Sequence, residues 1–247
     1  MTDIVPPRRP TLHVLVRRED IDPERLRGRV VVVIDVLFAT STIVQALAAG
    51  AARSVYPARD DDDARTQAAQ RPGAMVAGEY LARTLPDHAP ATPMALAQCL
   101  RDDVELIYFT TNGTRALAAC SGAEAVYAGA LTNAAALASH IVDVHAGLPV
   151  LLVCAGSLGR FSLEDFLGAG HLVHALRERG GYAPTDAALA AEMARGGGDL
   201  GQALSASRVG RMLARAGLDD EIAHAAACDS SDVVPKLRDG VLVRATA

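Results

Sequence analysis

Short apolar runs alternate with amphipathic segments along most of the chain. Residues 29–34 and 150–153 are almost entirely aliphatic, which is typical of strands buried on both faces of a parallel sheet. The segments that follow such runs carry apolar residues at helical spacing. The pattern predicts strands at 12–16, 29–34, 54–56, 74–77, 105–109, 125–127 and 150–153, and helices at 40–49, 64–70, 94–100, 114–120 and 133–145.

The second half of the chain is richer in helical patterns. Residues 162 to about 228 are predicted to be nearly all helical, with a break at the glycines 196–198. Residues 233–243 are predicted to form a hairpin around Asp239-Gly240. Residues 78–93 contain three prolines and are predicted to be a long loop, which in a compact domain is often functional.

Strands that alternate with helices predict an α/β fold. We expect a layered α/β/α arrangement around a largely parallel or mixed sheet. The prediction is one domain over residues 1–247, and a division into two similar, closely packed lobes at about 1–130 and 131–247 stays open.

In sheets of this kind, ligands bind at the carboxyl ends of the strands. Polar and charged side chains follow the predicted strands at those places. They are Asp35, Glu79, Asn112, Arg115, Asn133, Arg160, Glu164 and Asp165.

The segment 150–165 has the composition of an anion site. A buried strand leads into a loop with Gly156, Ser157 and Arg160, and a helix then begins, so that backbone N–H groups and a guanidinium can face a ligand. Glu164 and Asp165 suit the helix dipole but would repel an anion. Together these residues favour an anion bridged by a metal, as in a phosphate with magnesium.

Two further loops carry side chains that could donate hydrogen bonds to a phosphate. Thr111, Asn112, Gly113, Thr114 and Arg115 follow a strand, and arginine pairs well with phosphate through its planar fork. A helix cap explains the glycine and Thr114 well, and Asn112 and Arg115 poorly. Thr40, Ser41 and Thr42 are N-cap hydroxyls and candidate phosphate donors, although capping alone explains one of them.

Composition narrows the function. The net charge is −5 and Lys236 is the only lysine, so we expect no nucleic-acid partner and no Schiff-base chemistry at other positions. No apolar run reaches membrane-spanning length, and the N-terminus lacks a signal-peptide core, so we expect a cytoplasmic protein without a membrane partner.

The cysteines and histidines argue against other metal chemistry. The four cysteines lack C-x-x-C spacing and are predicted to be buried free thiols. The seven histidines form no zinc motif. Hard oxygen ligands from Asp35, Glu79, Glu164 or Asp165 suit magnesium better.

A competing pattern lies in the same loop. Residues 155–159, AGSLG, differ by one residue from the G-x-S-x-G nucleophile elbow, and Asp199 or Asp219 with His224 follow in the order of a triad. Ala155 stands where the motif has glycine, and the loop is long for an elbow. A serine hydrolase that uses Ser157 is the weaker alternative.

Several motifs together identify a family. IDVLFATST, GEYLART, YFTTNGTRAL, AGALTNAAALA, CAGSLGRFSLEDFLGAG and ACDSSDVVP occur in this order between about residues 30 and 235. The chain resembles the 2-phosphosulfolactate phosphatases of coenzyme M biosynthesis and their bacterial relatives. The resemblance implies magnesium-dependent hydrolysis of the phosphate monoester of a small sulfonated or carboxylated hydroxy acid, in a cleft of an α/β homodimer.

By motif position, the resemblance assigns the chemistry to residues named above. Asp35, Asn112, Arg115 and Arg160 would be catalytic, and Asp35 with Glu79, Glu164 or Asp165 would hold Mg²⁺. Whether Asp35 acts as a metal ligand, a base or a nucleophile stays open. Substrate would contact Thr40, Ser41, Thr111, Gly113, Thr114, Gly156 and Ser157.

The chain departs from the family pattern at two expected arginines. Phe38 and Tyr80 stand in their places, and Ala91-Thr92-Pro93 replaces the more usual N-S-P. Charge-assisted hydrogen bonds contribute ~1.5–3 kcal/mol each, so the loss of two arginines would weaken the binding of a dianionic substrate. The alternative is a non-catalytic binding homologue in which Phe38 and Tyr80 line a more apolar pocket.

Overall fold

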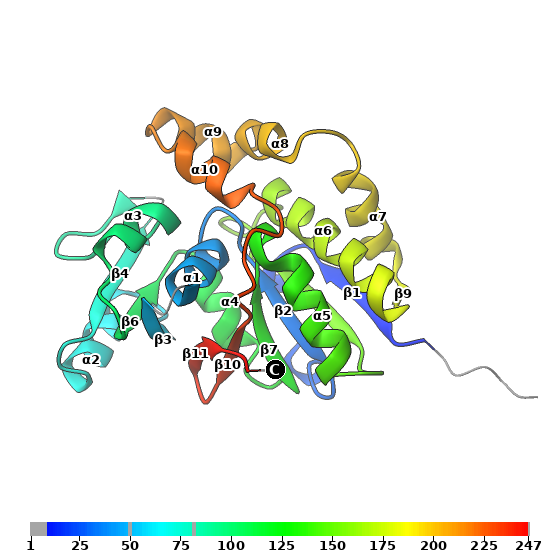
Figure 1. The fold of residues 1–247 in the computed structure, drawn as a ribbon, viewed down its shortest axis with the longest axis horizontal. Coiled ribbons are helices and arrows are strands. Elements are labelled where there is room, and N and C mark those ends of the chain that lie inside the picture. Colours follow the sequence, from blue (N-terminus) through cyan, green and yellow to red (C-terminus); the bar gives the residue numbers. More distant parts are fainter. Residues whose placement is uncertain (1–8, 49–50, 81–82, 247) are drawn as a thin grey trace, which may run out of the picture.

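The computed structural model describes residues 9–48, 51–80 and 83–246. These residues form one sheet of 11 strands with helices on both sides, which confirms the predicted α/β class (Figure 1). The strand order is β5-β4-β6-β3-β11-β10-β7-β2-β8-β1-β9.

Five strands form one parallel group at the end of the sheet that contains β9. They are β1 (Thr11–Leu15), β2 (Val30–Ile34), β7 (Ala125–Gly129), β8 (Val150–Cys154) and β9 (Ala183–Pro184). In β2, each residue pairs with β7 on one side and with β8 on the other. This central position explains why all five residues of the strand are apolar and buried.

A second parallel group lies at the other end of the sheet. It contains β3 (Ala52–Pro57), β4 (Met75–Tyr80) and β6 (Val104–Phe109), and the short β5 (Arg83–Thr84) pairs antiparallel with β4. The predicted loop at 78–93 is therefore shorter than expected, because β4 continues to Tyr80 and residues 83–84 pair back onto it.

The predicted C-terminal hairpin joins the two groups. It consists of β10 (Pro235–Arg238) and β11 (Val241–Arg244), slightly later in the chain than predicted. β10 pairs antiparallel with β7, and β11 pairs antiparallel with β3 through Leu242 and Val55. The two parallel groups therefore run in opposite directions, and only a strongly twisted sheet can bring their carboxyl ends to one place.

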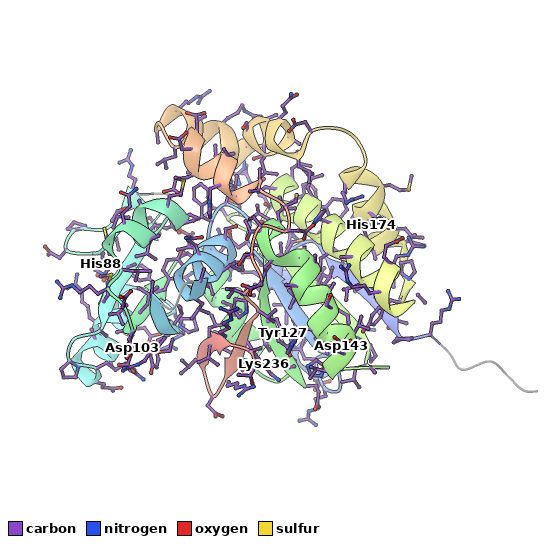
Figure 2. All side chains as sticks on the ribbon, viewed as in Figure 1. His88, Asp103, Tyr127, Asp143, His174 and Lys236 are labelled. Carbon is purple, nitrogen blue, oxygen red and sulfur yellow. The ribbon has the colours of Figure 1, made fainter. Side chains whose placement is uncertain are left out.

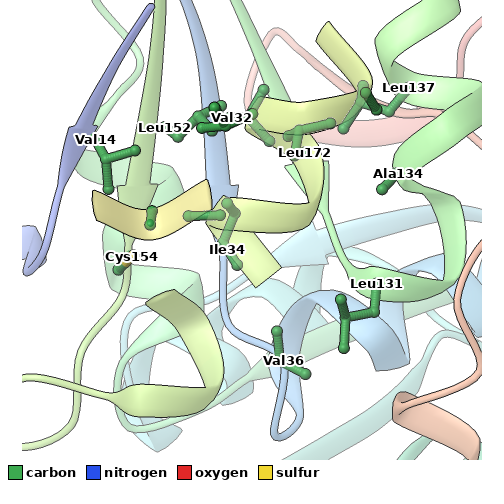
Figure 3. Close-up of a cluster of buried hydrophobic side chains, with 14 of the residues drawn as sticks. Val14, Val32, Ile34, Val36, Leu131, Ala134, Leu137, Leu152, Cys154 and Leu172 are labelled. Atoms are coloured by element: carbon green, nitrogen blue, oxygen red, sulfur yellow. The ribbon is translucent and has the colours of Figure 1, made fainter. Parts of the chain in front are cut away.

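Helices fill both sides of this sheet. α5 (Ala134–Val144), α6 (Leu163–Gly180) and α7 (Asp186–Arg195) cover one face of the first group, where Val32, Ile34 and Leu152 meet Leu137 and Leu172 (Figure 3). The other helices are α1 (Ala39–Leu47), α2 (Asp61–Gln70), α3 (Pro93–Cys99), α4 (Gly113–Ala119), α8 (Leu200–Ala206), α9 (Arg208–Arg215) and α10 (Asp219–Ala225), with short 3-10 helices at Arg18–Asp20, Pro23–Arg25 and Leu131–Asn133.

α1 and α4 share a core with strands of both groups. Val31 and Val33 of β2 and Leu106 and Tyr108 of β6 belong to one buried cluster with these helices. On the opposite face of β6, Phe109 packs in a small cluster beneath α2. The alternation of faces along each strand thus places the loops that follow β2 and β6 beside the same two helices.

The helical second half differs from its prediction in detail. Four helices follow α6, and the strand β9 separates α6 from the first of them. With two residues, β9 is too short to show in the hydrophobic pattern. Cys120 and Cys154 are buried free thiols as predicted, but Cys99 and Cys228 are exposed. Among the described residues, no helix combines the length and apolar character needed to span a membrane.

Candidate active site

The carboxyl ends of strands from both parallel groups line one cavity of about 120 Å³. The loops after β2, β6 and β8 and the end of β4 contribute its polar wall, and α9 contributes an apolar wall. All four predicted acidic residues lie in its lining: Asp35, Glu79, Glu164 and Asp165. The structure therefore brings together carboxylates that are far apart in the sequence.

Asp35 directly follows β2 and lies where two helices begin. Its carboxylate accepts a hydrogen bond from the backbone N–H of Ala39, at 3.4 Å, in the first turn of α1, and another from Gly113, the first residue of α4. Burial raises the pKa of Asp35 to about 7, and the nearby charges of Glu79 and Glu164 add to the shift.

Gly113 is required for this approach. A Cβ atom at this position would lie 2.3 Å from the Cβ of Ala39 and 2.7 Å from Oδ2 of Asp35. The glycine thus permits the start of α4 to contact the carboxylate, and it serves the site through shape rather than through a substrate-binding side chain.

Asp165 connects two of the loops. Its Oδ1 accepts the N–H of Val36, and its Oδ2 accepts the N–H of Gly156, both at 3.0 Å. Burial raises its pKa well above the usual range, and the charges of Asp35 and Glu164 act in the same direction. Both oxygens therefore hold backbone in place, which is a positioning role beside any contact with a metal.

The other two carboxylates are placed by the ends of elements. Glu79 lies near the end of β4 and accepts the N–H of Thr111 at 2.7 Å, which joins β4 to the loop after β6. Glu164 is buried in the first turn of α6, a helix that Ser162 caps through the N–H of Asp165.

The donor set fits a hard divalent cation. Carboxylate oxygens are the ligands that Mg²⁺ prefers, and it is usually held by only one or two of them together with water and substrate phosphate. Among the described residues, no group of three His, Cys, Asp or Glu side chains is placed to hold a metal ion, so a cation here would depend on one or two carboxylates with water and substrate phosphate. Burial and the neighbouring carboxylates raise the pKa values of Asp35 and Asp165, and a bound cation would stabilise their charged forms.

Three predicted substrate hydroxyls serve the backbone instead. Thr40 Oγ1 donates to the carbonyl of Asp35 at 2.9 Å, Ser41 Oγ donates to Val36 at 2.9 Å, and Thr114 bonds to Thr110. All three predicted hydroxyl residues are buried, and none lines the cavity. In this structure they fix the turns that precede α1 and α4, and their contact with substrate stays a prediction.

The predicted arginines also lie elsewhere. Arg115 is exposed and donates to the carbonyl of Arg59 at 3.0 Å, because two residues along a helix from Gly113 place it on the far side of α4. Arg160 is exposed and pairs through its backbone with Ser157 in a tight turn. Neither lines the cavity, so the structure does not support their predicted contact with phosphate.

The remaining predicted residues do meet at the cavity. Thr111, Asn112, Gly156 and Ser157 line it, and Asn112 Oδ1 accepts the N–H of Leu158 at 3.4 Å, which connects the loops after β6 and β8. Asn133 is buried, accepts the N–H of Ala130 in its own turn and donates to the distant carbonyl of Val233, which explains it as a structural residue.

Sequence reasoning missed Arg208 and the apolar wall of α9. The cavity lining includes four residues of α9: Arg208, Val209, Met212 and Leu213. From sequence alone, an arginine on an amphipathic helix is expected to face solvent. No local signal identifies these residues, because packing of α8–α10 over the strand ends puts them there.

The geometry of the cavity bears differently on the two alternative functions, the serine hydrolase and the non-catalytic binding protein. No described histidine lines the cavity, and the predicted base His224 is therefore absent from the lining that contains Ser157. Figure 2 shows two other histidines, His88 and His174, on opposite sides of the molecule. Phe38 does line the cavity as expected. Tyr80 is 61 % exposed and lies outside the lining, which corrects its predicted place in the pocket.

The fold and the acidic cavity at its strand ends define an α/β enzyme. The model of the 2-phosphosulpholactate phosphatase family matches residues 15–240. A probable 2-phosphosulfolactate phosphatase of Deinococcus radiodurans is 36% identical over 226 residues, covering 90% of this chain and 93% of the relative. Similarly named proteins of Symbiobacterium thermophilum and Carboxydothermus hydrogenoformans are 33% and 34% identical, covering 89% and 90% of this chain and 96% and 93% of theirs. The chain belongs to the 2-phosphosulfolactate phosphatase family.

Proposed function

We propose that this protein is a magnesium-dependent phosphatase that hydrolyses 2-phosphosulfolactate to sulfolactate and phosphate. The observation that carries the proposal is the gathering of four carboxylates in one cavity, where burial and mutual repulsion raise the pKa of Asp35 to about 7. The identity of the substrate is inferred from the names of the relatives reported above.

Asp35 with one of Glu79, Glu164 or Asp165 would hold Mg²⁺, and water and the substrate phosphate would complete its coordination. The ion would neutralise charge on the phosphate oxygens. Asp165 keeps the loops after β2 and β8 in register through its two backbone hydrogen bonds. Burial raises the pKa of Asp35 to about 7 in the metal-free cavity, and a bound Mg²⁺ would favour the charged carboxylate, which suits Asp35 to the role of ligand.

Apolar side chains complete the cavity. Leu37 and Phe38 after β2 and Val209 and Leu213 of α9 lie in its lining. They exclude water from the carboxylates, which strengthens electrostatic interactions within the site.

Metal removal tests this function. We expect chelation with EDTA to abolish phosphate release from 2-phosphosulfolactate, and added Mg²⁺ to restore it. Calorimetric titration with Mg²⁺ gives a second readout, in which Asp35→Asn should weaken binding and Asp62→Asn, on the exposed start of α2, should not. Full hydrolysis after rigorous metal removal would contradict the proposal.

Ligand binding without turnover is the outcome that would favour the binding-protein alternative. Phe38 in the cavity wall is the observation behind it. A panel of small phosphate esters, assayed for both binding and phosphate release, separates the two functions. The homodimer and the role in coenzyme M biosynthesis are part of the proposal through the family resemblance, and sedimentation velocity tests the former.

A further inference from the structure

The charge of the cavity is unevenly distributed. Four carboxylates line it, and among the described residues Arg208 is the one cationic side chain in the lining. The substrate proposed above carries a carboxylate and a sulfonate besides its phosphate. A metal on the carboxylates can account for the phosphate, but it leaves the other acid groups without a partner.

The surroundings of Arg208 hold it at the rim. Gly210 lets α8 and α9 cross closely, because a Cβ there would lie 1.9 Å from the carbonyl oxygen of Leu204. Ser207 caps α9 through the N–H of Gly210 at 2.9 Å, and Leu213 is buried. The first turn of α9, with Arg208, is thereby fixed above the cavity.

The guanidinium is available to a ligand. Arg208 is exposed, whereas Asp35 and Asp165 are buried, so the cation lies at the mouth of the cavity and the carboxylates lie deeper. Its hydrogen bond is a long one, from Nη2 to the carbonyl of Ser157 at 3.5 Å. A guanidinium can donate two parallel hydrogen bonds to a carboxylate or a sulfonate, which a carbonyl cannot accept in the same way.

We propose that Arg208 binds the acid group that the substrate carries beside its phosphate ester, and so determines specificity for acidic substrates. The proposal rests on the proposed phosphatase function. The anionic group, carboxylate or sulfonate, would lie at the mouth against α9, while the phosphate lies against the carboxylates and their metal.

A substrate series with one substitution tests this role. The substrates are 2-phosphosulfolactate, 2-phospholactate, which lacks the sulfonate, and propyl phosphate, which lacks both acids. We expect Arg208→Gln to lower kcat/KM for 2-phosphosulfolactate about tenfold, mainly through KM, with little change for propyl phosphate. An equal loss for 2-phospholactate would identify the carboxylate as the partner, and a loss confined to the first substrate would identify the sulfonate.

Two further variants serve as controls. Arg208→Lys keeps the charge but removes the fork, and should lose part of the selectivity. Arg211→Gln removes a charge one turn away on α9, where the side chain donates to the carbonyl of Ala206 and does not line the cavity, and should leave selectivity unchanged. An equal loss on all three substrates, or no loss with Arg208→Gln, would overturn the proposal.

A binding measurement separates this proposal from the phosphatase function. If the wild-type protein hydrolyses none of the three esters, the proposed function fails by itself. Sulfolactate, which has no phosphate, still tests Arg208 by calorimetry, and its Kd should rise about tenfold in Arg208→Gln but not in Arg211→Gln. An unchanged Kd, or no binding to the wild type, would refute the role of Arg208.

Discussion

Asp35 is a buried charge at the end of a fully apolar strand. Such a position destabilises the folded state unless a partner compensates the charge, and backbone N–H groups at the start of α1 and α4 do so only in part. Its pKa is about 7 in the folded protein, above the ordinary value of 3.8. The buried carboxylate of Asp35 therefore lowers the stability of the folded protein, as is common at functional sites.

This shift predicts a pH dependence of stability. Between pH of about 4 and 7 the folded protein retains a proton on Asp35 that the unfolded chain has released, so the free energy of unfolding should fall as pH rises. The effect amounts to up to about 4 kcal/mol at 1.36 kcal/mol per pKa unit. Urea unfolding of the metal-free protein at pH 5 and pH 7.5 measures it.

Asp35→Asn is the matching variant. It should flatten this pH dependence and raise stability at pH 7.5, while phosphate release falls by at least about 100-fold. Asp165 has a raised pKa for similar reasons and should leave a residual slope. Identical slopes in the variant and the wild type would show that Asp35 has an ordinary pKa.

Gly113 is a second residue whose effect follows from shape. Gly113→Ala should destabilise the protein by about 1–3 kcal/mol, because the added Cβ would overlap Ala39 and Asp35. Activity should fall as well, since the carboxylate must move. Thermal unfolding and kcat measure both effects, with Gly122→Ala as control, where an added Cβ meets nothing within 4 Å. A silent Gly113→Ala would mean that α4 can shift away from Asp35 without consequence.

At the scale of elements, α10 is attached to α3 across the cavity. Glu221 of α10 accepts hydrogen bonds from Thr92 Oγ1 at 2.5 Å, Met94 N at 2.8 Å and Ala95 N at 2.9 Å. The last two are backbone donors in the first turn of α3, which has no cap of its own. This contact joins the α8–α10 segment, which carries the apolar wall, to the second strand group.

Removal of this contact should loosen the wall of the cavity. Glu221→Ala leaves the part-buried backbone donors of Met94 and Ala95 without this partner, at a cost of about 1–3 kcal/mol in the free energy of unfolding. KM should rise more than kcat falls, because α9 lines the cavity and is proposed to contact substrate without taking part in the chemistry. Urea unfolding and steady-state kinetics test this, with the exposed Asp220→Ala on the same helix as control. Equal stabilities of the two variants would disprove the role of Glu221.

At the scale of the whole molecule, the C-terminal hairpin makes one sheet from two groups of strands. Leu242 is fully buried and pairs with Val55 at the junction between β11 and β3. Val233 and Leu242 thereby join a buried core whose other members lie between residues 26 and 155.

Leu242→Ala should therefore affect the entire fold. We expect a loss of about 2–5 kcal/mol in a single cooperative unfolding transition, since the cavity that it creates lies between the two groups. Val243→Ala, a half-buried neighbour in the same strand, should cost less. Differential scanning calorimetry distinguishes this outcome from two separate transitions, which would show that the groups unfold independently.

Much of the local structure was predictable from the sequence. The aliphatic run of β2 required burial on both faces, and the helical spacing at 64–70 predicted α2, which begins at Asp61 after the Asp60 cap. The positions of Asp35, Glu79 and Asn112 after their strands were also visible, because carboxyl ends of parallel strands are where ligands bind.

The sequence by itself determined the α/β class, most of the strands and the four carboxylates of the site, since these depend on periodicity and on the order of elements. The tertiary structure alone decided which cations lie near them. Arg115 and Arg160 face outward because helix phase and turn geometry direct them there, and Arg208 reaches the cavity because α8–α10 pack over it. The direction of a side chain depends on packing between distant segments, which no local pattern encodes.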